Sequence, residues 1–518
     1  MRTFLYSIFV LFIGFSTTFA QFNKQSSDSN KIDKKQQNGQ FAIRHLQEDV
    51  EDILSVSELS NASIGISVIN LETGETFYKK NPNILLIPAS TLKLFTTAAG
   101  LEVLGTDFHY ATRIYIDGTI KDSGELDGDI IIRASGDPSM SLMYMKDPSV
   151  ILDNIALKLD SLRITSIKGN IVLDHGYFDN ESFGPGWAID DIPYPYSAPI
   201  SAISFYDNKV ELSFKSGVKA GDYSRLTIIP DNSYLRIVNN VMTVQSNTPT
   251  VLETDSDPRS GVIDIQGAIA LPDPTSSTKK TSADPSTSIG LSIDDPVQYF
   301  LHVFKQRLEK MGIRIRGSLL RNELIDGPIN YVELKQIFTH ISPPLSSIIG
   351  TINTFSHNLG ADMLFKTMGK EQFGEGSFSK GSESIKKYLS SIGIMPEQCS
   401  IVDGSGLSRL NLLSAQQQTT LLSKVHRSTY KEVFRASLAK PGMPGTLNNR
   451  MLKSLAQQQV IAKTGSMNNV SCLSGYITTR DGEELAFSIM INGFTAPDGI
   501  IRNIQDMICM RLASFTRK

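Results

Sequence analysis

Ser90 and Lys93 are the first residues whose types and spacing could do chemistry together. They stand three positions apart, at the start of a largely apolar helix pattern that follows the run 84–87 and Pro88. A serine at a helix N-terminus lies where backbone N–H groups point outward, and a lysine one turn later returns to the same face. Burial among apolar neighbours would let that lysine lose its proton and act as a base. The pair predicts a serine nucleophile, Ser90, activated by Lys93.

The spacing of this pair is weak evidence by itself, because other serines in the chain also have a lysine three residues later. Ser377 with Lys380 and Ser437 with Lys440 are examples. For a random pair of this kind a solvated helix face is the better interpretation. Ser90 differs because it alone follows an extended apolar run and the dipeptide Pro-Ala.

Two further motifs contain residues suited to substrate binding. Ser356 and Asn358 flank a histidine inside a helical pattern. Lys463, Thr464 and Gly465 come directly after an apolar strand pattern. A lysine and a threonine at a strand end, followed by a glycine that permits close backbone approach, suit a free carboxylate on a substrate. The alternative for Lys463 alone is an edge-strand lysine that hinders aggregation.

In this order, the motifs SxxK, SxN and KTG are the signature of penicillin-binding proteins and serine β-lactamases. The first two motifs usually lie close together, but here Ser90 and Ser356 are far apart. This insertion resembles peptidase family S13, the class C low-molecular-mass D-alanyl-D-alanine carboxypeptidase/endopeptidases of the penicillin-binding protein 4 type. The similar stretches cover nearly all of the mature chain: PASTLKLFTTAAGLEVLG (88–105), SGDPSM (135–140), GPGWAIDD (184–191), YSAPISAIS (196–204), DGSGLSR (403–409), PGTLNNR (444–450) and AKTGSMNNVSCLSGY (462–476).

The resemblance implies catalytic roles for the first two motifs. Ser90 would attack the carbonyl of the penultimate D-Ala, giving an acyl-enzyme that water then hydrolyses. Lys93 would be the base for acylation, while the group that activates the second step stays open. Ser356 would relay a proton to the leaving amine, and the Asn358 amide would hold the substrate's peptide.

The resemblance also implies a binding role for the third motif. Lys463 and Thr464 would bind the substrate's terminal carboxylate, with Gly465 allowing close approach. The backbone N–H groups of Ser90 and Ser466 would form an oxyanion hole, in which the loss of one donor typically costs about 3 kcal/mol.

Three other residues are candidates for contact with the substrate. The resemblance places Arg409 beside the stem peptide. Asn468 falls where the family usually carries a different polar residue. Asp137 would either reach a cationic side chain on the stem peptide or act as a turn aspartate, and the two interpretations have equal weight. His357 would point away from the face of its neighbours in a helix, so it is not expected to be a catalytic histidine.

The elements that must position these residues follow from hydrophobic periodicity. Apolar runs predict strands near both ends of the chain, and 3.6-residue patterns predict helices before, between and after them. The strands are expected at 64–69, 76–79, 460–463, 472–479 and 485–491. The helices are expected at 41–54, 90–105, 296–311, 345–368, 382–392, 415–426 and 499–514.

Residues 112–290 differ from both ends, because short strand-like runs separated by Gly, Asp, Asn and Pro indicate β-rich modules. Within them, 271–289 is Pro/Ser/Thr-rich and is expected to be a loop or an exposed connection. With the resemblance, this predicts an α/β (α+β) fold with a transpeptidase-like, serine β-lactamase/DD-peptidase-like catalytic domain. That domain would comprise 41–111 and 291–518, split by two inserted β-rich domains, one nested in the other.

The composition is that of an ordinary globular protein, with 518 residues, of which 40% are hydrophobic and 20% charged. A formal net charge of −3 indicates neither nucleic acid nor an anionic membrane as a partner. The three cysteines, Cys399, Cys472 and Cys509, are widely spaced, and the seven histidines form no ligand pattern. We therefore expect no metal and no cofactor.

The first residues differ from the rest of the chain. Arg2, an apolar core over 4–15 and a small-x-small signal before Gln21 predict a cleaved signal peptide over 1–20. The alternative is an uncleaved anchor of borderline length. Residues 21–40 are polar and are expected to form a flexible leader. The mature protein would then be exported to the periplasm, without a stable membrane anchor.

The sequence leaves several functions open. The main interpretation is a DD-carboxypeptidase with DD-endopeptidase activity. Its partners would be peptidoglycan stem peptides ending in D-Ala-D-Ala, cross-linked muropeptides, and β-lactams as covalent inhibitors. A β-lactamase or another D-amino peptide hydrolase on the same fold is the second interpretation, and a non-catalytic peptidoglycan-binding protein is the third. The balance of the two activities, the third residue of the stem peptide and a possible homodimer are not determined by the sequence.

Overall fold

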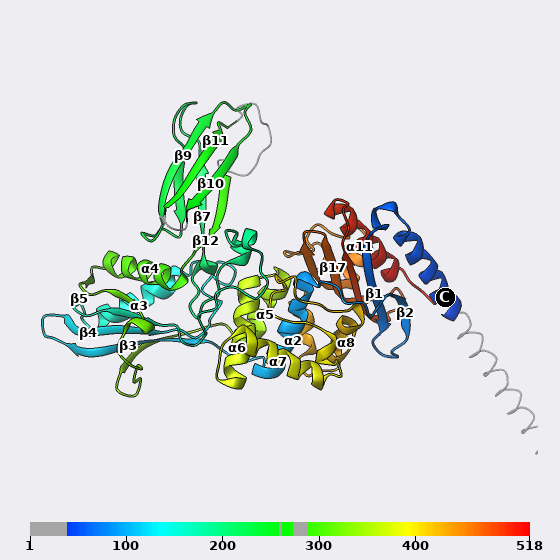
Figure 1. The fold of residues 1–518 in the computed structure, drawn as a ribbon, viewed down its shortest axis with the longest axis horizontal. Coiled ribbons are helices and arrows are strands. Elements are labelled where there is room, and N and C mark those ends of the chain that lie inside the picture. The colour runs from blue at the N-terminus through cyan, green and yellow to red at the C-terminus, as the bar shows by residue number, and fades with distance from the viewer. Residues whose placement is uncertain (1–38, 258–261, 273–286, 518) are drawn as a thin grey trace, which may run out of the picture.

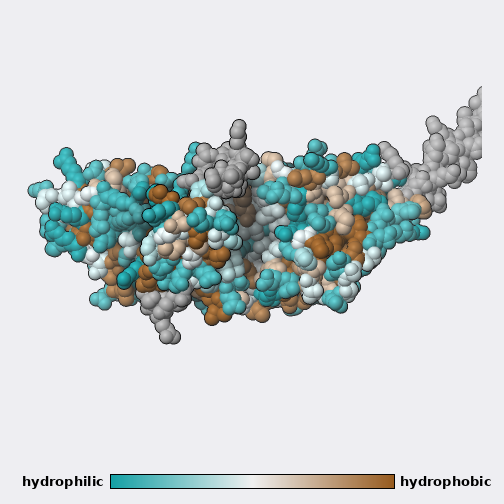
Figure 2. All heavy atoms as spheres, turned by 90° about the horizontal axis from the view of Figure 1, so that it is seen from above, coloured by the Kyte–Doolittle hydropathy of each residue, from teal (hydrophilic) through white to brown (hydrophobic). Residues whose placement is uncertain are grey.

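The computed structural model describes residues 39–257, 262–272 and 287–517. The predicted signal peptide lies outside these residues, as do the leader up to residue 38 and most of the stretch 271–289. Within the described part of the chain, no helix is long and apolar enough to cross a membrane. The face seen in Figure 2 mixes hydrophilic residues with scattered hydrophobic ones.

An antiparallel five-stranded sheet joins the two ends of the chain. Its order is β16-β17-β18-β1-β2, so the first strand lies beside the last, with Ile66 opposite Ile489. The strands span Ser63–Asn70 (β1), Thr76–Lys80 (β2), Val460–Met467 (β16), Val470–Thr478 (β17) and Glu484–Asn492 (β18). These strands confirm the ones expected from the apolar runs.

Helices cover both faces of this sheet (Figure 1). On one face lie the helix over residues 39–54 and α11 (Asp498–Ala513), which share a hydrophobic core with the strands. On the other face lies α8 (Ala415–His426), in which Gln418 Nε2 donates to Thr91 Oγ1 of the short turn η2 (Ala89–Leu92) at 2.9 Å. The turn η2 leads into α2 (Lys93–Leu104). Tyr476, from β17, donates to the Leu422 carbonyl of α8 at 2.8 Å.

A group of helices buries α2 completely over its first nine residues. Its members span Leu345–Thr354 (α5), Asn358–Phe373 (α6), Phe378–Ser391 (α7) and Lys431–Ser437 (α9). Gly100, in the middle of α2, is required by the closeness of α6, because a Cβ there would lie 3.0 Å from a methyl group of Leu364.

The single helix expected over 345–368 is wrong, because the chain breaks between α5 and α6. Ser356 has a left-handed φ of 61°, and the His357 N–H donates to the Ile352 carbonyl at 3.1 Å. A residue with left-handed φ, followed by a hydrogen bond from the next N–H to the carbonyl five residues earlier, forms a Schellman motif. This motif is a common way for a helix to end. The apolar periodicity continues across the break, and Ser356 occupies a position that usually holds glycine.

A second, seven-stranded sheet is built from two separate segments. Its strands span Ala111–Ile120 (β3), Glu125–Arg133 (β4), Ser166–Ile167 (β5), Ile171–Asp174 (β6), Arg314–Ile315 (β13), Leu319–Arg321 (β14) and Lys335–Ile341 (β15). Helices α3 (Ser149–Ser161) and α4 (Pro296–Lys310) pack on it. Because β15 pairs with β3, we propose that the insertion runs to about residue 341 and not to 290.

A smaller β unit is nested within this insertion and projects away from the rest of the molecule (Figure 1). It contains two three-stranded sheets, of order β12-β7-β8 and β10-β11-β9. The strands span Lys209–Lys215 (β7), Arg225–Ile229 (β8), Arg236–Val244 (β9), Val251–Asp257 (β10), Val262–Ala270 (β11) and Thr287–Ser292 (β12).

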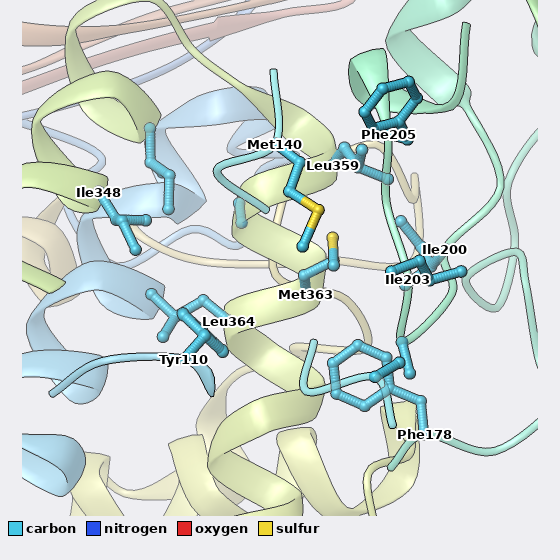
Figure 3. Packing of buried hydrophobic residues seen from close by; sticks show 14 of the residues in the cluster. Tyr110, Met140, Phe178, Ile200, Ile203, Phe205, Ile348, Leu359, Met363 and Leu364 are labelled. Atoms are coloured by element: carbon cyan, nitrogen blue, oxygen red, sulfur yellow. The ribbon is translucent and has the colours of Figure 1, made fainter. Parts of the chain in front are cut away.

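The insertion and the helical group share one hydrophobic core. Figure 3 shows Met140, Ile200 and Phe205 of the insertion close to Leu359 and Met363 of α6. All five side chains are buried and belong to a single cluster. The insertion is therefore packed against the helix that begins at Asn358.

Candidate active site

Ser90 lies in a short 3-10 turn, η2 (Ala89–Leu92), that leads directly into α2. The turn is closed by the Thr91 N–H, which donates to the Pro88 carbonyl at 3.2 Å. Lys93 is the first residue of α2 and is fully buried, and its Nζ lies 3.0 Å from Ser90 Oγ. The hydroxyl is thus held one turn from an amine at hydrogen-bond distance.

The Lys93 amine has two further acceptors. It donates to Asn358 Oδ1 at 2.6 Å and to the Ser405 carbonyl at 2.5 Å. Burial lowers the pKa of Lys93 to about 8, although the carboxylates of Asp362 and Asp403 act in the opposite direction. An amine with this pKa is neutral in a substantial fraction near neutral pH, so it can accept a proton from Ser90.

Two buried carboxyl groups lie behind Lys93, and they differ in their partners. Asp362 Oδ1 accepts from the Gly404 and Ser405 N–H groups at 2.7 and 3.0 Å. Its Oδ2 is buried and has no hydrogen-bond partner among the described residues, and burial raises the Asp362 pKa to about 8. The Asp403 carboxylate accepts four hydrogen bonds, from the N–H groups of Gly406 and Ser408 and from the side chains of Asn411 and Trp187.

Lys463, on β16, is fully buried and donates to Ser356 Oγ at 2.8 Å and to the Thr464 carbonyl at 2.9 Å. Burial, together with the charge of Lys93, places the pKa of Lys463 well below its usual value. A fully buried amine does not guard an exposed strand edge, so the alternative of an aggregation-blocking lysine is wrong.

Gly465 lets strand β16 approach the nucleophile's turn. A Cβ at this position would lie 2.6 Å from the Pro88 carbonyl oxygen and 3.1 Å from the Ser90 nitrogen. Both contacts are to backbone, which cannot move aside without shifting the turn. The absence of a side chain here sets the distance between the Ser90 turn and the strand that carries Lys463.

A cavity of about 270 Å³ opens at Ser90. It is lined by residues of η2, of the break before α6, of the loop after Asp403, of the end of β16 and of the insertion. They are Ser90, Asp191, Tyr196, Ser356, Asn358, Gly406, Leu407, Arg409, Ser466, Met467 and Asn468. The first two motifs and Ser466, the residue directly after the third, are far apart in the sequence and line one space.

Comparison with known proteins identifies the family of this site. The sequence model of the D-Ala-D-Ala carboxypeptidase 3 (S13) family matches residues 46–514. The chain belongs to the S13 family. It is 31% identical over 483 residues to a D-alanyl-D-alanine carboxypeptidase of Actinomadura sp. (strain R39), covering 91% of this chain and 85% of that one. It is 25% identical over 455 residues to the D-alanyl-D-alanine carboxypeptidase DacB of Haemophilus influenzae, covering 86% and 89%.

The fold is also that of a solved structure. Penicillin binding protein 4 (dacB) from Haemophilus influenzae matches with a TM-score of 0.75 and 23% identity, covering 90% of this chain and 99% of that one. The resemblance to S13 and the predicted fold class, a transpeptidase-like domain with additional β-rich domains, are both confirmed.

Most of the residues predicted for the S13 site lie together. Ser90 Oγ and Asn358 Oδ1 both meet the Lys93 amine, and Ser356 Oγ meets the Lys463 amine. The two groups are joined along the chain, because Ser356 and Asn358 lie only two residues apart. Arg409, Asn468 and Ser466 line the same cavity, and Arg409 Nη2 donates to the Asn468 carbonyl at 3.1 Å. Their catalytic and binding roles remain predictions.

Asp137 is a predicted residue that the structure does not bring to the lining of this cavity. It is 1% exposed, its Oδ1 accepts from the Ser139 N–H at 2.8 Å, and its Oδ2 lies 3.4 Å from His340 Nε2. These contacts correspond to the turn aspartate, the second of its two interpretations.

His357 does not lie in a helix, as its pattern suggested, but it is turned away from the reacting groups. Its Nε2 lies 3.2 Å from Asp207 Oδ1, and its Nδ1 lies 3.1 Å from the Tyr144 hydroxyl. Both partners belong to the insertion. His357 therefore connects the insertion to the segment that carries Ser356 and Asn358.

Asp191 and Tyr196, both from the insertion, are cavity residues that sequence reasoning missed. The Tyr196 hydroxyl donates to Asp191 Oδ1 at 2.6 Å, and the Tyr196 carbonyl accepts from Asn358 Nδ2 at 2.8 Å. They lie in or next to GPGWAIDD and YSAPISAIS, stretches that carried the family resemblance without an assigned chemistry. Nothing in the local pattern of these turns distinguishes a cavity carboxylate from an exposed one.

Proposed function

We propose that the chain is a serine D-Ala-D-Ala carboxypeptidase that acts through a Ser90 acyl-enzyme. The observation that carries this proposal is the contact of Ser90 Oγ with Lys93 Nζ, a buried amine whose pKa is lowered to about 8. A base of this pKa fits a nucleophile that must lose its proton near neutral pH.

In the first step the neutral Lys93 amine takes the proton of Ser90, and Oγ bonds to the carbonyl carbon of the penultimate D-Ala. The backbone N–H groups of Ser90 and Ser466 would hold the resulting oxyanion. The tetrahedral intermediate then collapses, the peptide C–N bond breaks, and the leaving amine receives a proton through Ser356. Water hydrolyses the ester in a second step and regenerates the Ser90 hydroxyl.

The substrate would be oriented by charge at its two ends. Lys463 and Thr464 would meet the carboxylate of the terminal D-Ala, with a charge-assisted hydrogen bond. At the other end Asp191 is the carboxylate that lines the cavity, beside Arg409 and Asn468. We propose that Asp191, in place of Asp137, meets a cationic group on the stem peptide.

The same site would also cleave DD-cross-links and react with penicillin. In a cross-link the bond is again a D-Ala carbonyl joined to an amine, so the Ser90 chemistry is unchanged. A β-lactam would acylate Ser90 in the same way. A solved structure of the Haemophilus influenzae penicillin binding protein 4, with a TM-score of 0.69 to this chain, is described as complexed with a novel β-lactam.

Labelling with a fluorescent penicillin tests the acyl-enzyme directly. We expect Ser90→Ala to abolish covalent labelling and peptide release while the protein stays folded, because it removes one oxygen atom with little change in volume. Wild-type labelling of the variant would show that Ser90 is not the nucleophile. Relative rates on penicillin and on D-Ala-D-Ala peptides separate a carboxypeptidase from a β-lactamase.

The cellular location is also a proposal. The residues before Gln21 have the pattern of a signal peptide, and the substrate of the proposed reaction lies outside the cytoplasm. We expect the mature protein to begin at Gln21 in the periplasm. Mass analysis of the exported protein with residues 1–20 retained would instead indicate an anchored form.

A further inference from the structure

A second cavity, of about 820 Å³, adjoins the Ser90 cavity along β16. Thr464, Gly465 and Ser466 line it, and Ser466 also lines the Ser90 cavity. Its other walls come from the loop 446–450, from β17 and from the first turns of α11. The steps of the proposed reaction use only Thr464 and Ser466 at the edge of this cavity and give its other walls no role.

The direction of the substrate along β16 indicates what would enter this cavity. In the proposed pose the substrate carboxylate lies at Thr464, the oxyanion at the Ser466 N–H and the stem peptide near Asn468. The Ser90 cavity takes in the Ser466–Asn468 end of this path, and the second cavity takes in the Thr464–Ser466 end. The second cavity therefore lies on the side of the leaving group.

The leaving group differs between the two substrates of the proposed function. In an uncross-linked stem peptide it is a single D-Ala, which ends at the carboxylate. In a cross-linked substrate the leaving amine belongs to a residue of a second stem peptide, and that peptide must continue past Thr464. Only the cross-linked substrate needs room on this side.

We propose that the second cavity binds the second stem peptide of a cross-linked substrate. The inference rests on the proposed function and names the surface that makes the site an endopeptidase as well as a carboxypeptidase. The ligand is an anionic chain of amides and carboxylates, so it calls for hydrogen-bonding side chains and a positive charge.

The lining of the cavity has this chemistry. Asn448, Asn449 and Asn503 line it with amide side chains that no hydrogen bond within the described residues engages. Arg502 adds a guanidinium that is half exposed and only loosely paired with Asp498, at 3.3 Å. Such groups can exchange water for the amides and carboxylates of a peptide at little cost.

One wall of the cavity is held rigid from within. Arg450 Nε and Nη2 donate to Asp506 Oδ1 at 2.9 and 2.7 Å, and Nη2 also lies 3.1 Å from Gln505 Oε1. These bonds tie the loop 446–450 to α11, so the cavity keeps its shape without a ligand. Because Asp506 neutralises Arg450, the remaining positive charge is that of Arg502.

The test compares two substrates with one set of variants. The first cavity variant is the full-length double variant Arg502→Gln/Asn503→Ala. It is assayed on a purified cross-linked muropeptide and on an uncross-linked pentapeptide. Asn503→Asp is a second variant, which places a negative charge in the cavity. Lys305→Gln is the matched control, because Lys305 forms a similar i,i+4 surface pair on α4, with Glu309. The rate of penicillin labelling reports folding and the Ser90 chemistry for each variant.

We expect kcat/KM on the cross-linked muropeptide to fall about 3- to 10-fold in both cavity variants. This loss corresponds to the free energy of one or two exposed hydrogen bonds to charged groups. The pentapeptide and penicillin reactions should stay at the parent rate, as should the Lys305→Gln enzyme on all substrates. An equal loss on both peptides, or no loss on the cross-linked one, would overturn the inference. A parent enzyme that cleaves only the pentapeptide overturns the inference alone, and one that cleaves neither overturns the proposed function.

Discussion

Four ionisable side chains lie buried together around the nucleophile. All four are fully buried: Lys93, Lys463, Asp362 and Asp403. Burial shifts the pKa of each in the direction that favours the neutral form of its side chain. The lysine pKa values are lowered and the aspartate pKa values are raised. Because Lys93 interacts electrostatically with each of the other three groups, a change in one of their charges should be visible in the pKa of Lys93.

Asp362→Asn tests this coupling. The substitution keeps an oxygen for the Gly404 and Ser405 N–H groups but removes a carboxylate that raises the Lys93 pKa. Because Asp362 is itself partly protonated near its own pKa of about 8, the pKa of Lys93 should fall modestly, and its neutral form should be present at slightly lower pH. We expect the acid limb of the pH profile of penicillin acylation to move to lower pH.

The stability of the same variant has a predictable sign. The Asp362 pKa is about 8 in the folded protein and 3.8 in the unfolded chain, so between these values the unfolded chain has lost a proton that the folded one keeps. Raising the pH through this window destabilises the parent, and the slope should be smaller in Asp362→Asn. Asp231→Asn, at an exposed carboxylate, is the control and should leave both the slope and the acid limb unchanged.

Lys463→Ala is expected to weaken catalysis far more than folding. A charge-assisted hydrogen bond is worth about 1.5–3 kcal/mol, so kcat/KM on D-Ala-D-Ala peptides should fall roughly 10- to 100-fold or more. A substrate with an amidated C-terminus should be slow with the parent enzyme and nearly insensitive to the substitution. The same fractional loss on free and amidated substrates would remove Lys463 from the carboxylate site.

At the scale of elements, the break between α5 and α6 allows both residues of the second motif to reach the candidate active site. The Schellman end of α5 turns the chain at Ser356, so that Ser356 Oγ faces Lys463 while Asn358 begins α6 and faces Lys93. A continuous helix would place two residues only two positions apart on different faces. The insertion contacts this break through His357, whose ring nitrogens lie close to Asp207 and Tyr144.

His357→Gln should loosen the break. The variant loses the imidazole that lies between Asp207 and Tyr144, and it leaves a buried carboxylate whose pKa His357 helps to lower. We expect a loss of about 1–3 kcal/mol in unfolding free energy and slower penicillin acylation. In His357→Gln the buried Asp207 carboxylate keeps its ion pair with Lys209, at 3.1 Å. In His357→Gln/Asp207→Asn this buried charge is gone, so stability should return in part. A double variant no more stable than His357→Gln would contradict this role.

Sequence alone predicted some elements well and others poorly, for physical reasons. The strands of the first sheet have largely apolar runs, such as 64–69, because helices cover both faces of the sheet. The position of the Ser90 turn was predicted from Pro88 and from the apolar residues around it. The end of α5 was missed because the apolar period continues through it. Asp191 was missed as a cavity residue because its position depends on packing between the insertion and α6, which no local pattern records.

At the scale of the whole molecule, the insertion and the helical group should behave as one unit in unfolding. Their buried side chains belong to one cluster, whereas the outer face of the first sheet has a separate one. Trp187, the only tryptophan in the sequence, lies at this junction, where its Nε1 donates to Asp403 Oδ2 at 3.0 Å. Its emission therefore reports on the contact between the insertion and the active site.

Urea unfolding can test this shared core. We expect Trp187 emission and the capacity for penicillin labelling to be lost at the same urea concentration, because separating the insertion from α6 would expose the core that positions Asn358. Loss of labelling while the emission stays native would show that the two parts unfold independently.

The pairing of β1 with β18 also has a consequence in time. A ribosome makes the segment with Ser90 long before β16, and at about 5–20 residues per second the delay is roughly 20 to 80 seconds. During this interval the growing chain has its nucleophile but neither Lys463 nor β18, one of the two strand partners of β1. Ser90 would therefore become reactive toward the substrate only in chains whose synthesis is complete. In a chain released early, Ser90 would be present but would not form an acyl-enzyme.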